Sequence, residues 1–187
     1  MRIAIAVTGL AALSLAACND AETVADTGDP ESVAAASAEL PNPEPGQYRS
    51  VGELVKFEVA DVPPEQVEMV RGMMGEVFAR EQLQCITQEQ SDEGYRGFVR
   101  EMGQNDSCEL TDYQTSSSSF TAKLTCSQDG ANYTTDVNGD VSGTQMDMTM
   151  AMNGTFPDMG ETSITLRMRS ERVGDCPAGE GEGEAAG

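Results

Sequence analysis

Apolar and polar side chains alternate along most of the chain between Cys108 and Val173. A two-residue period places neighbouring side chains on opposite faces of a β-strand. A turn in the four serines 116–119 folds the start of this stretch into a hairpin with Cys108 opposite Cys126. The pattern therefore predicts a run of antiparallel strands, and this is the strongest constraint that the sequence places on the fold.

The next turn is expected at Asn138-Gly139, because this dipeptide favours the tight turn of a two-residue hairpin. The strand that follows, 140–152, carries four methionines at alternate positions, so all four share one face. They are Met146, Met148, Met150 and Met152. A last strand is expected over 163–173, where Ile, Leu and Met alternate with Thr and Arg.

The chain before Cys108 has a mixed pattern. Residues 47–59 alternate like a strand, and Pro63-Pro64 then ends it. Apolar residues recur every three or four positions up to about residue 80, which predicts an amphipathic helix. Thr87 with Gln90 forms a capping-box pattern, which predicts the start of a second helix.

These elements together predict an α+β fold. We expect a curled antiparallel β-meander of four or five strands, a partial barrel, with the two helices inserted after the first strand. The composition predicts one domain over 47–176, preceded by an acidic disordered tether over 18–46 and followed by a disordered acidic tail over 177–187. The tether has seven acidic residues, no basic residue and no aromatic one, a composition that cannot bury a core.

The first 17 residues read as a lipoprotein signal peptide. A short apolar stretch after Arg2 closes with Leu15-Ala16-Ala17-Cys18 and is too short to span a bilayer. We expect Cys18 to be the first mature residue and to carry acyl chains such as palmitate. The expected location is therefore the periplasmic side of the bacterial cell envelope. In lipoproteins of this kind, Asp after the lipidated cysteine is the usual signal for retention in the inner membrane. This chain has Asn19 at that position, so we expect the outer membrane.

Lipidation of Cys18 leaves four cysteines, an even number that suits disulfides in an oxidising compartment. Three connectivities exist. The hairpin register selects Cys108 with Cys126 and leaves Cys85 with Cys176. A metal site or a redox pair is disfavoured because the chain has no histidine and no C-x-x-C sequence.

Several short motifs together resemble a known family. They are Pro45-Gly46-Gln47-Tyr48, Cys85-Ile86-Thr87-Gln88-Glu89-Gln90, the paired Cys108 and Cys126, and the closing Val173-Gly174-Asp175-Cys176. The pattern resembles the bacterial domain-of-unknown-function family 3617, whose members are small periplasmic or lipid-anchored proteins. The resemblance covers about 45–176. It implies no activity and no catalytic residues.

Nothing in the sequence points to catalysis. Without histidine there is no imidazole base for a Ser or Cys nucleophile, and neither a Gly-x-Ser-x-Gly motif nor a glycine-rich phosphate loop occurs. We therefore expect no enzyme activity and no cofactor. A net charge of −21 repels phosphate backbones and excludes nucleic acid as an expected partner.

The leading hypothesis is a lipid-anchored accessory module that binds the membrane through its anchor and holds an envelope protein or an apolar ligand. The alternatives are a structural envelope protein without a small ligand and a Cu(I)-handling protein. Under the copper hypothesis, the thioethers of Met146, Met148, Met150 and Met152 are the ligands of Cu(I). We favour a core role for these methionines, since alternating Met fills irregular gaps in a half-buried sheet.

Overall fold

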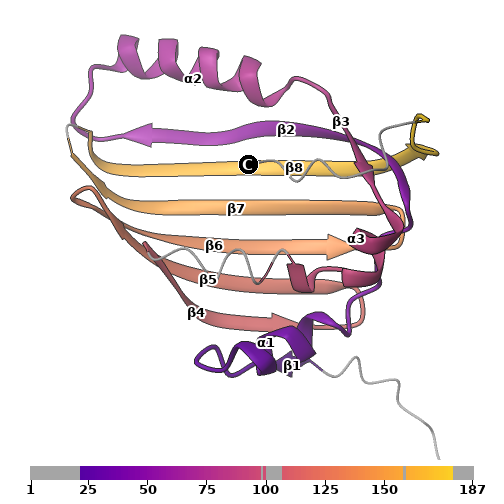
Figure 1. Ribbon diagram of the computed structural model, residues 1–187. Helices are drawn as coiled ribbons and strands as arrows, with labels where there is room; N and C mark the ends of the chain where they lie inside the picture. Colours follow the sequence, from indigo (N-terminus) through magenta and orange to yellow (C-terminus); the bar gives the residue numbers. More distant parts are fainter. Residues whose placement is uncertain (1–21, 98, 100–106, 158, 179–187) are drawn as a thin grey trace, which may run out of the picture.

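The computed structural model of the chain describes residues 22–97, 99, 107–157 and 159–178. Within these residues one eight-stranded antiparallel sheet has the order β1-β4-β5-β6-β7-β8-β2-β3 (Figure 1). The strands are β1 (Thr23–Val24), β2 (Gly46–Val59), β3 (Gln82–Ile86), β4 (Cys108–Thr115), β5 (Ser119–Gln128), β6 (Ala131–Val141), β7 (Gln145–Phe156) and β8 (Gly160–Gly174). The helices are α1 (Pro30–Ser37), α2 (Pro64–Phe78) and α3 (Gln88–Glu93). The α+β curled sheet is confirmed, with more strands than predicted.

Strands β4 to β8 form a continuous meander, as the alternation predicts. The predicted turn after β4 is present, and the hairpin register pairs Cys108 with Cys126. Strand β2 then closes onto β8 along nearly its whole length. Strand β3 pairs only with the first five residues of β2, and α2 packs along β2 at the same edge of the sheet (Figure 1).

Helix α2 has the predicted position but a shallower contact with the sheet than its pattern predicts. Its N-terminus follows Pro63, and none of its residues is buried. Phe78 packs against Gly52 of β2, whereas Met69, Met73 and Val77 are each more than half exposed. The helix therefore shields the edge of the sheet instead of filling the core.

The prediction of two helices after the first strand missed the strand between them. Strand β3 joins α2 to α3 and pairs with β2 from Gly46↔Ile86 to Ser50↔Gln82. Its five residues alternate too briefly to be recognised from the sequence. Helix α3 begins at the predicted capping box, where Thr87 Oγ1 accepts from Gln90 N and Gln90 Oε1 accepts from Thr87 N.

The turn expected at Asn138-Gly139 is absent. Both residues lie inside β6, and the chain turns at residues 142–144, between Val141 and Gln145. Gly139 lies directly opposite Phe120 of β5. The glycine therefore makes room for an aromatic ring across the sheet, and the local turn preference is overridden.

The disordered tether predicted over 18–46 is corrected for its described part, residues 22–46. Strand β1 pairs with the end of β4, and Ala25 N donates to Tyr113 O over 3.0 Å. Helix α1 is N-capped by Asp29. Its Val33 and Ala36, with Leu40 just beyond, are buried against the sheet. Ala36, at 2% exposure, has a side chain small enough to let this part of the helix approach Thr115 of β4.

Polar contacts fix α1 in place. The buried hydroxyl of Ser37 donates to Val33 O and is hydrogen-bonded to the Tyr113 hydroxyl over 2.9 Å. The buried Thr115 Oγ1 donates to Ala36 O. Predicted leader residues 1–17, Cys18 and residues 179–187 of the predicted tail lie outside the described residues.

Candidate functional site

Three cross-strand rows on one face of the sheet carry apolar side chains from β7, β8 and β2. Directly opposite residues of antiparallel strands share a face. The rows are Met148–Met168–Gly52, Met150–Leu166–Leu54 and Met152–Ile164–Phe57. We call the partly buried members of these rows the methionine–leucine face; they are Leu54, Met150, Met152, Ile164, Leu166 and Met168.

The rest of the same face is filled by other parts of the chain. Over β4, β5 and β6, Tyr113, Phe120 and Val137 are at most 3% exposed beneath the residues of α1 and Val99. The methionine–leucine face, in contrast, keeps partial exposure. One curled sheet therefore has a covered half and a half that is partly open.

The four methionines of β7 do share a face, as the alternation predicts. Met148 is only 5% exposed and belongs to the core, whereas Met146 and Met150 are partly buried against it. Met152 is also partly buried. The burial of Met148 is consistent with a core role, and the more exposed methionines lie on both sides of it along β7.

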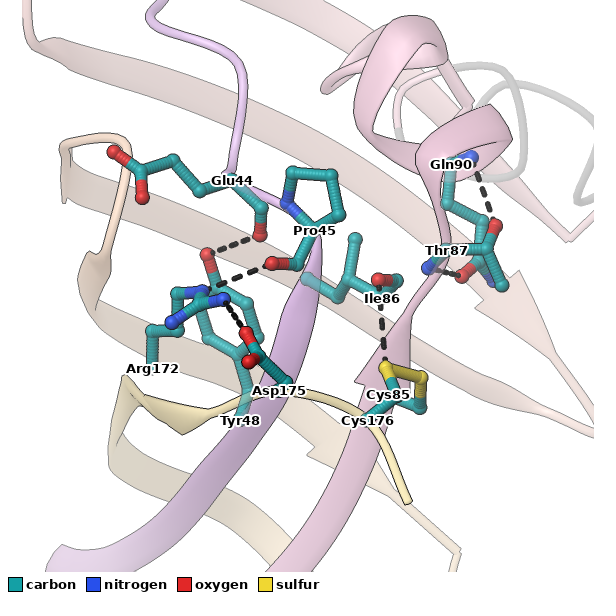
Figure 2. The surroundings of a disulfide bond; sticks show 10 residues. All are labelled: Glu44, Pro45, Tyr48, Cys85, Ile86, Thr87, Gln90, Arg172, Asp175 and Cys176. Atoms are coloured by element: carbon teal, nitrogen blue, oxygen red, sulfur yellow. Dashed lines mark hydrogen bonds and ion pairs between the residues drawn. A yellow bond between two sulfur atoms is a disulfide. The ribbon is translucent and has the colours of Figure 1, made fainter. Parts of the chain in front are cut away.

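The two disulfides are Cys85–Cys176 and Cys108–Cys126, the pairs expected from the sequence. Cys108–Cys126 links directly opposite residues of β4 and β5. Cys85–Cys176 links β3 to the chain after β8, across the first residues of β2 (Figure 2). It therefore ties together three strands that are distant in sequence.

Three of the four motifs that resemble the family, those that contain Tyr48, Cys85 and Cys176, meet around the Cys85–Cys176 disulfide (Figure 2). The Tyr48 hydroxyl lies 2.9 Å from the carbonyl oxygens of both Glu44 and Gly143, so it can donate to either. Arg172 lies opposite Tyr48 on β8 and donates from Nε to Pro45 O over 2.9 Å. Its Nη2 pairs with Asp175 at 2.7 Å.

Gly46 is required at this junction by its backbone and by its neighbours. Its φ of +149° lies in a region that side chains rarely adopt. A Cβ there would approach Arg172 Nε and Gly174 O to 2.5 Å. The motif around Pro45-Gly46 is thus explained by packing. We call the contacts of Gly46, Tyr48 and Arg172, together with the Cys85–Cys176 disulfide, the latch.

The opposite face of β7, β8 and β2 carries a network of ion pairs. Asp147 accepts from both Arg167 and Arg169, and Arg49 pairs with Glu171 and, more loosely, with Glu81. Hydrogen bonding from Arg167 is the main reason that the pKa of Asp147 lies below its ordinary value. A groove of about 550 Å³ lies beside these residues. Arg49 and Arg169, the arginines in its lining, are already paired with carboxylates, so the groove offers no strong anion site.

The titratable side chains of the described residues are not gathered into a metal-binding site. No cluster of three or more His, Cys, Asp or Glu side chains that could hold a metal occurs among them. Tyr48 and Tyr113 are buried and Tyr95 is partly buried, and burial raises the pKa of each phenol. They are therefore neutral at physiological pH. In the same part of the chain, no helix is long and apolar enough to cross a bilayer.

Comparison with known proteins identifies a family that the chain matches. A family model described as "Protein of unknown function (DUF3617)" matches residues 43–176. No curated protein and no solved structure matches the chain. The matched region starts just before the latch and ends at Cys176, so it leaves out β1 and α1.

Proposed function

The chain belongs to the DUF3617 family, and we propose that it is a lipid-anchored, non-catalytic binding module of the bacterial cell envelope that holds an apolar ligand on the methionine–leucine face. The observation that carries the proposal is the unequal covering of the sheet. The β4–β6 half is filled by α1, whereas the β7–β8–β2 half keeps apolar side chains partly exposed.

The shape of the sheet supports this proposal. A curled antiparallel sheet can hold a small apolar molecule on its inner face. Methionine adapts its shape to irregular ligands because its side chain is unbranched and flexible. Three of the six residues of the methionine–leucine face are methionines, which favours a loosely shaped apolar group such as an acyl chain over a rigid polar ligand.

The lipid anchor rests on the sequence around Cys18. Leu15-Ala16-Ala17-Cys18 after a short apolar stretch is typical of lipoprotein processing. Two disulfides suit an oxidising compartment and so agree with export to the periplasmic side. With Asn19 after the cysteine, we propose the outer membrane as the site of attachment.

Probe binding tests the ligand site. The mature chain, residues 18–187, with Cys18→Ser has neither an acyl chain nor the apolar leader, and it has no tryptophan, so the fluorescence of bound N-phenylnaphthylamine is easily read. We expect saturable binding. Leu166→Asn should weaken it about tenfold, because loss of a leucine contact removes about 1.5 kcal/mol of apolar burial.

Thr165→Asn is the matched control, since Thr165 is the preceding residue of β8 and lies on the opposite face. Thermal unfolding of both variants checks that the fold survives. Absence of saturable binding, or equal weakening in the two variants, would contradict the proposed site and favour a structural envelope role. Lipid analysis of the protein purified from its own membrane then asks which apolar molecule accompanies it beyond its anchor.

A further inference from the structure

Very little chain separates the proposed anchor from the folded body. Only residues 19–21 lie between Cys18 and Glu22, the first described residue, and Thr23 already belongs to β1. Five fully extended residue steps, from Cys18 to Thr23, span at most about 18 Å. The long tether expected over 18–46 is therefore replaced by a short linker.

Strand β1 cannot detach from the sheet to lengthen this linker without loss of structure. It pairs with β4 through Thr23↔Thr115 and Val24↔Gln114, and Thr23 Oγ1 donates to Glu39 over 2.7 Å. The chain directly after β1 continues into α1, whose Val33 is buried in the core. Residues 22–40 thus move as part of the body.

We infer that the edge formed by β1, the end of β4 and α1 lies against the surface of the bilayer that holds Cys18. The inference rests on the proposed lipid anchor. Beyond the anchor itself, the inference states how the domain is oriented on the membrane. The opposite edge of the sheet, β3, lies seven strand positions away from β1 and so points away from the bilayer. At about 4.8 Å per strand this is up to about 34 Å along the sheet.

The chemistry of this edge indicates the kind of lipid surface that it meets. Residues 22–40 contain five acidic and no basic side chains; the acids are Glu22, Asp26, Asp29, Glu31 and Glu39. Such an edge is repelled by anionic headgroups and is compatible with zwitterionic ones. Val24, 68% exposed, is an apolar side chain on this edge.

Single tryptophans can report the orientation, because the chain contains none. Val24→Trp places a reporter on the membrane-facing edge, and Leu83→Trp places a matched one on β3, where Leu83 is 63% exposed. The acylated full chain is reconstituted in phosphatidylcholine vesicles that contain a small fraction of dansyl-phosphatidylethanolamine. We expect several-fold more energy transfer to the dansyl headgroups from the Val24→Trp reporter.

A spacer of about 20 Gly and Ser residues inserted between Ala21 and Glu22 provides the control, since such a coil averages about 25 Å. We expect transfer from the Val24→Trp reporter to fall to the level of the Leu83→Trp reporter, with vesicle flotation unchanged. Equal transfer from both reporters without the spacer, or transfer unaffected by it, overturns the orientation and leaves the anchor intact. A mature N-terminal peptide without acyl mass overturns both.

Discussion

Gly139 of β6 lies beneath the ring of Phe120 of β5. The two residues are directly opposite in the antiparallel register, and a Cβ on Gly139 would come well within 3.0 Å of the ring carbons Cε1 and Cζ. Phe120 is 3% exposed, so its ring is enclosed by the core. The close approach of these two residues fixes the packing at the centre of the covered half of the sheet.

We predict that Gly139→Ala destabilises the protein by about 2 kcal/mol, because overpacking of a filled core forces side chains out of their preferred positions. Gly143→Ala is the control: Gly143 lies in the turn after β6, where the nearest atom to a new Cβ is 3.4 Å away. Urea unfolding measures both changes. Equal stability of the two variants would contradict the prediction and show that the Phe120 ring can shift to accommodate the new methyl group at little cost in free energy.

This pair also explains a limit of sequence reasoning. The alternation after Cys108 predicted the meander, because a period of two is a local signal that tertiary packing reinforces. The Asn138-Gly139 dipeptide misled because its glycine serves a contact with Phe120, 19 residues earlier, which no local window contains. The turn instead forms around Gly143, where Glu44 N donates to Gly143 O over 2.6 Å.

Leu40 provides a test of the corrected N-terminal segment. It is 3% exposed and belongs to the core, although its surroundings in the sequence are those of a disordered tether. We predict that Leu40→Ala costs about 2–4 kcal/mol of stability, the usual loss for truncating a buried leucine. Val24→Ala, at a position 68% exposed, should change stability by less than about 0.5 kcal/mol. A disordered tether would make both substitutions silent in urea unfolding.

The two disulfides also differ in whether the local sequence predicts them. Cys108–Cys126 follows from the register of one hairpin, and Cys85–Cys176 followed only by elimination. The contacts of the latch were not foreseeable, because Tyr48 reaches a carbonyl oxygen 95 residues away in the chain. The sequence motifs and the predicted Cys85–Cys176 disulfide marked part of the latch, but they gave no sign that Arg172 and Gly143 belong to it.

We predict unequal losses when each disulfide is removed by paired Cys→Ser substitutions. Chain entropy assigns about 3 kcal/mol to the Cys108–Cys126 bridge, with a sequence separation of 18, and about 4–5 kcal/mol to Cys85–Cys176, with a separation of 91. Urea unfolding under non-reducing conditions compares the two double variants. A smaller loss at Cys85–Cys176 would mean that the latch holds β2, β3 and β8 together without its disulfide.

Tyr95 predicts how stability responds to alkaline pH. Burial, with a smaller contribution from nearby Tyr48, raises the pKa of Tyr95 from 10.0 to about 12. Between these values the unfolded chain releases the phenolic proton and the folded chain retains it, so stability falls as pH rises above about 10. We predict that Tyr95→Phe removes up to about 2 kcal/mol of this loss by pH 12. Urea unfolding of both proteins across this range measures the difference; Tyr113, whose pKa is also raised by burial, acts equally in both. An equally steep loss in Tyr95→Phe would show that the Tyr95 phenol ionises freely in the folded protein.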